Sequence, residues 1–159
     1  MRQGTAGEAT VTVRATPEEV YDTITDVRRI PEWSPECVSA RWIGGADGPE
    51  VGARFVGANK RGLARWRTRP RVVVADRPRE FSFVMGVPPF GDLTRWTYRI
   101  GPGEQEGTSE VTERFEMLRD LPGVILFFER HVMRVADREQ DLQRNLETSL
   151  ERLRAVVEA

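Results

Sequence analysis

Apolar and polar residues alternate along most of the first 118 positions, which is the pattern of strands with one buried face. Turn residues such as Gly, Pro, Asn and Asp separate the alternating runs. Pro70 interrupts the fourth run, which predicts a bulge or an edge position there. Together the runs predict an antiparallel sheet of about six to seven strands, over residues 9–13, 38–43, 53–58, 64–74, 81–85, 94–100 and 111–117.

Residues typical of a helix start follow the first predicted strand. Thr16 can cap a helix, Pro17 suits its first position, and Glu19 completes a capping box. Pro31 and Pro35 then break the helical pattern. We therefore predict two short helices near the N-terminus.

The spacing of apolar residues changes in the last part of the chain. Apolar positions over residues 124–157 recur at spacings of three, four or seven, which are helical spacings. They predict one long C-terminal helix over about residues 124–158, bent or broken near its start. A coiled coil would also fit this spacing. We favour a helix that covers the sheet, because a sheet with one apolar face needs a second layer.

The order of these elements predicts a cavity. A twisted antiparallel sheet of this size curls, and a straight helix laid over its concave face leaves space at one end. The expected class is α+β, with residues 1–159 as a single domain and residues 1–7 as a flexible start. If bulky side chains filled the space, the cavity would be collapsed and the domain would serve as an interaction module.

Composition narrows the range of partners. The formal net charge is −1, so the chain has no basic excess for binding nucleic acid. A single cysteine, Cys37, excludes an internal disulfide and fits a cytoplasmic location. The N-terminus has no apolar run of the kind found in signal peptides. The longest apolar cluster, residues 124–128, is shorter than the ~20 residues that span a bilayer. We expect a cytoplasmic protein with no nucleic-acid partner and no stable membrane insertion.

Several short motifs together resemble the START-like superfamily, and within it the bacterial polyketide cyclase/dehydrase and lipid transport group. The resemblance runs from about residue 8 to residue 158. It implies a helix-grip fold and a cavity for a small hydrophobic ligand such as a lipid, a fatty acid or a polyketide-like aromatic. Members of the superfamily include cyclases, hydrolases, lipid carriers and receptors, so the fold does not determine one reaction. The residues that carry the resemblance are 11–13, 16–21, 30–35, 51–55, 66, 68, 78, 81–83, 96–98, 107–108 and 111–113, with the leucine spacing of the last helix.

Large side chains share the inward face of the predicted strands and of the final helix. Each could belong to the ordinary core, but so many on one concave face favour a ligand-lined cavity. The expected apolar ligand-binding residues are Phe55, Trp66, Phe83, Met85, Trp96, Tyr98, Phe115, Phe128 and Val132.

A few polar residues share that inward face. Glu113 lies between two apolar inward positions, where a carboxylate is costly unless it is paired or protonated. Glu113 is a candidate general acid or base or a ligand anchor, and Tyr98 could orient a ligand carbonyl. Glu113 could instead pair with a basic residue or lie at the wet end of the sheet. Asn59 and Thr68 are candidate hydrogen-bond donors, or polar groups satisfied within the protein.

No cofactor or metal site is expected. The single histidine, His131, and the single cysteine, Cys37, do not provide a zinc ligand set. No Gly-x-Ser-x-Gly nucleophile elbow and no nucleotide-binding glycine pattern is present. Four arginines over residues 65–71 form a basic stripe, which is typical of a solvated strand edge and could also bind an acidic partner.

The function predicted from the sequence is binding of a small hydrophobic ligand in an internal cavity, as a carrier or sensor. The alternative is a polyketide cyclase, aromatase or dehydrase that uses the same cavity, with Glu113 and Tyr98 as candidate catalytic residues. Either a monomer or a homodimer would fit. The apolar segments 87–90 and 121–128 could form a lid, a dimer contact or a membrane-touching rim.

Overall fold

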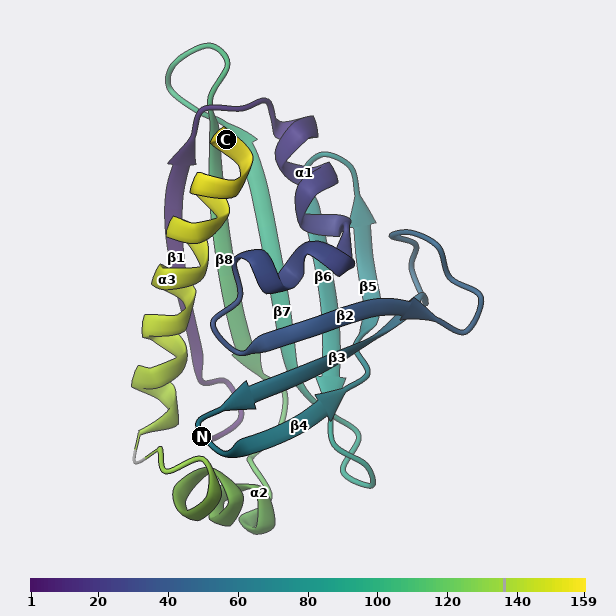
Figure 1. The fold of residues 1–159 in the computed structure, drawn as a ribbon, viewed down its shortest axis with the longest axis vertical. Helices are drawn as coiled ribbons and strands as arrows, with labels where there is room; N and C mark the ends of the chain where they lie inside the picture. Colours follow the sequence, from purple (N-terminus) through teal and green to yellow (C-terminus); the bar gives the residue numbers. More distant parts are fainter. Residues whose placement is uncertain (136) are drawn as a thin grey trace.

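A computed structural model describes residues 1–135 and 137–159 as a curved antiparallel sheet with helices on its concave side (Figure 1). The elements, in chain order, are β1 (Ala6–Val13), α1 (Pro17–Thr25), the 3-10 helix η1 (Val27–Glu32), β2 (Cys37–Ile43), β3 (Arg54–Arg61), β4 (Ala64–Thr68), β5 (Arg71–Asp76), β6 (Glu80–Gly86), β7 (Asp92–Pro102), β8 (Ser109–Met117), α2 (Gly123–Phe127), the π-helical turn η2 (Phe128–Val132) and α3 (Arg138–Glu158).

The sheet has eight strands within the described residues, in the order β1-β8-β7-β6-β5-β3-β2, with β4 paired to β3 outside this path. The sequence predicted six to seven because the run over residues 64–74 was counted as one strand. Pro70 separates β4 from β5 instead of only bulging one strand. The strand β3 changes partner at this point, since residues 57–61 pair with β4 while Arg54 pairs with Arg71 of β5.

The two short helices near the N-terminus form as the capping signals predicted. The Glu19 amide donates to Thr16 Oγ1 at 3.2 Å, and the Thr16 amide donates to Glu19 Oε2 at 3.3 Å. Their buried face meets the sheet, where Tyr21 packs edge-on against Phe81 with ring centroids 6.4 Å apart. The helices thus cover one end of the concave face.

The C-terminal helix α3 lies along β1 and β8 and supplies the second layer of the fold (Figure 1). Leu142, Leu146, Leu150 and Leu153 are buried at helical spacing along it. The helix therefore covers the sheet, as the spacing predicted, and the apolar face of α3 is turned toward the sheet.

The single helix expected over residues 124–158 is broken into two parts. α2 and η2 occupy residues 123–132, and α3 begins only at Arg138. Arg134 has a positive φ of 57°, which an α-helix does not allow, and the Asp137 side chain caps α3 by accepting from the Gln140 amide at 3.1 Å. Of these parts, only α3 has buried residues, whereas the apolar residues of α2 and η2 are half-buried or exposed.

The chain start differs from the expected flexible segment at residues 1–7. β1 already begins at Ala6, and the preceding backbone is hydrogen-bonded to the end of β8. The Gly4 amide donates to the Met117 carbonyl at 2.9 Å, and the Met117 amide donates to the Thr5 carbonyl at 2.8 Å. Backbone pairing of this kind leaves no hydrophobic pattern in the sequence.

Truncation of Leu153 tests how α3 is anchored. Leu153 is fully buried in the main core, so Leu153→Ala should lower the free energy of unfolding by about 2–5 kcal/mol. Arg152→Ala, on the exposed side of the same turn, should change it by less than about 0.5 kcal/mol. Urea denaturation of both variants measures the difference. Equal stabilities of the two variants would contradict the packing of α3 on the sheet.

Candidate functional site

A cavity of about 590 Å³ lies between the concave face of the sheet and the N-terminal half of α3. The two halves of α3 differ, because Leu150 and Leu153 belong to the main core whereas Leu142 and Leu146 line the cavity. The core therefore closes one end of the space between helix and sheet and leaves the other end open. The hypothesis of a collapsed cavity is wrong for this structure.

Most of the residues predicted from strand parity line this cavity. The structure brings together Phe55, Asn59, Trp66, Thr68, Phe83, Met85, Trp96, Tyr98, Glu113 and Phe128 in its wall. Aromatic rings make continuous contacts there. Phe55 packs edge-on against Phe83 at a centroid distance of 5.3 Å, and Trp66 packs edge-on against Phe128 at 6.2 Å. The second contact joins β4 to η2 at the cavity border.

Two predicted ligand-binding residues, Phe115 and Val132, do not line the cavity. Phe115 is fully buried against Trp96 and leans over Gly7 of β1, where a Cβ atom would approach its ring at 2.7 Å. The missing side chain of Gly7 thus lets the ring leave the cavity. Val132 is 45% exposed because the break before α3 turns it away from the sheet.

Several wall residues were missed by the sequence prediction. Trp33 is buried after η1, between two prolines that indicated only a break in the helical pattern. Asn145 and Ser149 lie on the cavity side of α3, one and two turns after Leu142. A search for apolar stripes passes over them because they are polar, although their spacing matches the helix period.

Glu113 and Tyr98 are opposite each other on β8 and β7 and form a buried hydrogen bond. The Tyr98 hydroxyl donates to Glu113 Oε1 at 2.9 Å, and Glu113 is only 4% exposed. Burial raises the pKa of Glu113 to about 7, while the hydrogen bond from Tyr98 and the proximity of the Ser149 hydroxyl act in the opposite direction. Burial also raises the pKa of Tyr98, as does the neighbouring Glu113 charge. Near neutral pH, Glu113 can therefore take up or release a proton while Tyr98 stays protonated.

Two polar atoms in this region have no hydrogen-bond partner among the described residues. They are Glu113 Oε2, an acceptor, and Trp33 Nε1, a donor, and a third such atom, the donor Trp96 Nε1, lies in the same wall. No basic residue of the described chain forms an ion pair with Glu113, so the structure differs from the alternative of a paired carboxylate. The arrangement provides one acceptor and two donors in a wall that is otherwise mainly apolar.

A second polar group lies around Gly57 on β3. A Cβ atom at Gly57 would come within 3.3 Å of Thr68 Oγ1, 3.9 Å of Cys37 Sγ and 4.0 Å of Asn59 Nδ2. The glycine thus leaves these three side chains open toward the cavity that they line. Burial raises the pKa of the Cys37 thiol, which keeps the thiol protonated, and its Sγ–H donates to the Ser39 carbonyl at 3.3 Å.

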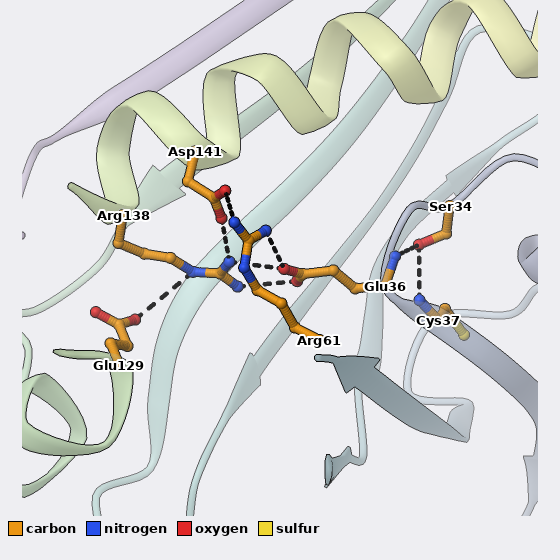
Figure 2. Close-up of polar contacts among 7 residues, drawn as sticks. All are labelled: Ser34, Glu36, Cys37, Arg61, Glu129, Arg138 and Asp141. Carbon is orange, nitrogen blue, oxygen red and sulfur yellow. Dashed lines mark hydrogen bonds and ion pairs between the residues drawn. The ribbon is translucent and has the colours of Figure 1, made fainter. Parts of the chain in front are cut away.

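An ion network closes part of the cavity wall around Arg138 (Figure 2). The Arg138 guanidinium forms two hydrogen bonds with Glu36, at 2.7 and 2.9 Å, and one with Asp141 at 2.6 Å. Arg61 also contacts Asp141 at 2.6 Å, and Glu129 lies 3.7 Å from Arg138 Nε.

This network connects the loop before β2, the end of β3, η2 and the first turn of α3. Burial opposes the charge of Arg138, but hydrogen bonds and charge from Glu36 and Asp141 raise its pKa overall. Arg138 is therefore a fixed cation whose donors are directed at protein carboxylates.

The apolar segments predicted to border the cavity do so. Residues of both segments, 87–90 and 121–128, belong to its wall. Phe127 and Val124 are each 62% exposed on α2. The three roles predicted for this border, a lid, a dimer contact or a membrane-touching rim, stay predictions. No helix among the described residues is both long enough and apolar enough to cross a membrane.

The described residues contain no cluster of three potential metal ligands from His, Cys, Asp or Glu. His131 lies on η2 and is exposed, with its ring 4.5 Å from that of Phe127. Arg67 of the basic stripe is exposed on β4 and also contributes to the cavity wall.

The sequence matches the profile of one protein family over nearly its whole length. The family is described as polyketide cyclase / dehydrase and lipid transport, and the match covers residues 5–158. No curated protein matches the chain.

Solved structures are similar to the chain from end to end. A polyketide-cyclase-like protein from Corynebacterium glutamicum is 25% identical, with a TM-score of 0.59 over 99% of this chain and 91% of that one. A START superfamily protein from Mycobacterium smegmatis is 15% identical, with a TM-score of 0.71 over 98% of each chain. The major latex-like protein 151 of Panax ginseng is 12% identical, with a TM-score of 0.66 over 96% of this chain and 98% of that one. These likenesses confirm the predicted START-like, helix-grip fold of the α+β class.

The buried carboxyl of Glu113 predicts a specific pH dependence of stability. Below pH 4.5 the group is protonated in both the folded and the unfolded state. Between pH 4.5 and about 7 the folded state keeps a proton that the unfolded state has lost, so stability falls as pH rises. Glu113→Gln should remove this pH dependence. As the pH rises from 4.5 to about 7, the free energy of unfolding of the variant should therefore rise by about 3 kcal/mol relative to wild type.

Urea denaturation between pH 4 and pH 8 measures this difference. Glu110→Gln, on the exposed face of the same strand, is the matched control and should follow the wild-type profile. If Glu113→Gln and Glu110→Gln had the same profile, the burial assigned to Glu113 would be wrong.

Proposed function

This chain belongs to the polyketide cyclase / dehydrase and lipid transport family, and from that premise we propose that it binds one small, mainly apolar molecule in the cavity beside α3. The observation that carries this proposal is the cavity itself, about 590 Å³ in volume and lined mainly by aromatic and aliphatic side chains. Pockets of this size and chemistry are typical of small-molecule sites. In this role the protein is a carrier or sensor, and the cytoplasm is its expected location.

The walls of the cavity favour a ligand with an extended apolar body. Phe55, Phe83 and Trp66 provide ring faces and edges on the sheet side. Leu142 and Leu146 provide the opposite wall from α3. Apolar burial supplies about 25 cal/mol for each Å² removed from water, so a molecule that touches both walls gains most of its affinity from shape and apolar contact.

A second function, catalysis of a cyclase or dehydrase type, is favoured by the Tyr98–Glu113 pair. A carboxyl whose pKa is raised to about 7 is suited to general acid or base catalysis at neutral pH. The Tyr98 hydroxyl, which donates to Glu113 at 2.9 Å, could pass a proton to or from a ligand carbonyl through the same hydrogen bond. We place the carrier or sensor function first because the surface of the wall is mainly apolar.

A cavity-filling substitution tests the binding function. Asn145 lines the cavity on α3, so Asn145→Trp should fill part of its volume and lower the affinity for an apolar probe at least tenfold. Glu147→Trp, two residues further along and exposed, places the same indole on the solvent side and should bind as wild type does. Titration with the neutral fluorophore N-phenyl-1-naphthylamine measures both. Equal affinities for the two variants, or no binding by wild type, would overturn the proposed function.

Recovery of the bound molecule separates the two functions. Native mass spectrometry identifies any molecule that copurifies with the protein, and extraction after prolonged incubation shows whether it has changed. A carrier should return the same molecule from wild type and from Glu113→Gln. A product formed by wild type, but not by Glu113→Gln or Tyr98→Phe, would instead establish the catalytic function.

A further inference from the structure

The polar cluster around Tyr98 indicates which chemical group of a ligand the cavity can hold. Glu113 Oε2 and Trp33 Nε1 are buried, and neither has a hydrogen-bond partner within residues 1–135 and 137–159. Both side chains belong to the cavity wall and lie beside the Tyr98 hydroxyl, with the Ser149 hydroxyl as a further neighbour. Trp96 Nε1, two residues before Tyr98 on β7, is also buried in this wall without a partner. A buried polar group without a hydrogen bond is unfavourable, so a ligand that completes both bonds gains affinity.

The charges of the wall restrict the ligand further. Among the described residues, the basic side chains of the wall are Arg138 and Arg67. The Arg138 donors are directed at Glu36 and Asp141, with Glu129 close by, and its side chain is only 13% exposed. Arg67 is exposed to solvent on β4. The amino group of Met1, which also lies in the wall, is half-exposed and close to Glu129. A carboxylate ligand would therefore find no uncommitted, fully buried cation in the described wall.

A carboxylate near Tyr98 would also meet Glu113. Two carboxylates in one buried site repel each other unless they share a proton. An alkylammonium ion could donate to Glu113 Oε2, but it has no lone pair to accept from Trp33 Nε1. It would also lose its hydration in a mainly apolar cavity, which is costly. A hydroxyl group has one proton to donate and two lone pairs to accept, so it matches both atoms.

Resting on the binding function proposed above, we propose that the ligand is a neutral apolar molecule with a hydroxyl group, an alcohol or a phenol. The hydroxyl donates to Glu113 Oε2 and accepts from Trp33 Nε1, while the apolar body lies between Phe55, Phe83 and the leucines of α3. The inference excludes fatty acids as the preferred ligands, although the resemblance to the superfamily allows them.

Competition among three molecules of equal chain length tests this proposal. Decan-1-ol, decanoic acid and decylamine each displace N-phenyl-1-naphthylamine if they enter the cavity. At pH 7.5, decan-1-ol should bind at least tenfold more tightly than decanoic acid and more tightly than decylamine. This ranking uses the wild-type protein alone. Binding of the acid or the amine as tight as that of the alcohol would overturn the proposal.

Two variants test the assigned atoms. Glu113→Gln removes the carboxylate, so the ratio of alcohol affinity to acid affinity should fall at least tenfold, while Glu110→Gln should leave the ratio unchanged. Trp33→Phe keeps an aromatic ring and removes the N–H, so it should weaken decan-1-ol several-fold with little effect on N-phenyl-1-naphthylamine. An unchanged ratio in folded Glu113→Gln would overturn the assignment of the hydroxyl to this carboxyl.

The outcomes distinguish the inference from the function on which it rests. If neither the fluorophore nor any of the three molecules binds wild type, the proposed binding function fails. If all of them bind but the alcohol is not preferred, the binding function stands and the hydroxyl assignment is wrong.

Discussion

The burial of one apolar face of α3 against a curved sheet is the constraint on which the rest of this structure depends. The strands turn large side chains toward their concave face, and these need a cover. The sheet curls while α3 runs straight along β1 and β8 (Figure 1). Contact is therefore close at the end where Leu150 and Leu153 join the main core, and a cavity remains at the other end. The site follows from this mismatch of shapes.

Polar groups are held at two places around this cavity with different consequences. At the first turn of α3, Arg138 is held by Glu36 and Asp141, so charge there is balanced within the protein (Figure 2). At Glu113 the balance is incomplete, because one carboxylate oxygen accepts from Tyr98 and the other has no partner within the described chain. The ion network at Arg138 stabilises the wall, whereas the free oxygen of Glu113 is available to a ligand.

Strand parity placed most of the predicted strand residues correctly in the cavity wall, since side chains at alternate positions must share a face. It failed for Phe115, because parity gives the face of a residue but not the direction in which its ring leans over Gly7. Helical spacing failed for Val132 because the break near Arg134 depends on backbone conformation and on the Asp137 cap. Trp33 was missed because its position between prolines indicated only a break in the helical pattern.

In the proposed function, one small apolar molecule binds between the sheet and the first half of α3. Amide chemical shifts of isotope-labelled protein, recorded while N-phenyl-1-naphthylamine is added, test it most directly. The largest changes should occur at inward positions of β3, β6, β7 and β8 and at residues 142–149 of α3. Changes confined to the outer face of the sheet, or no saturable change at all, would contradict it.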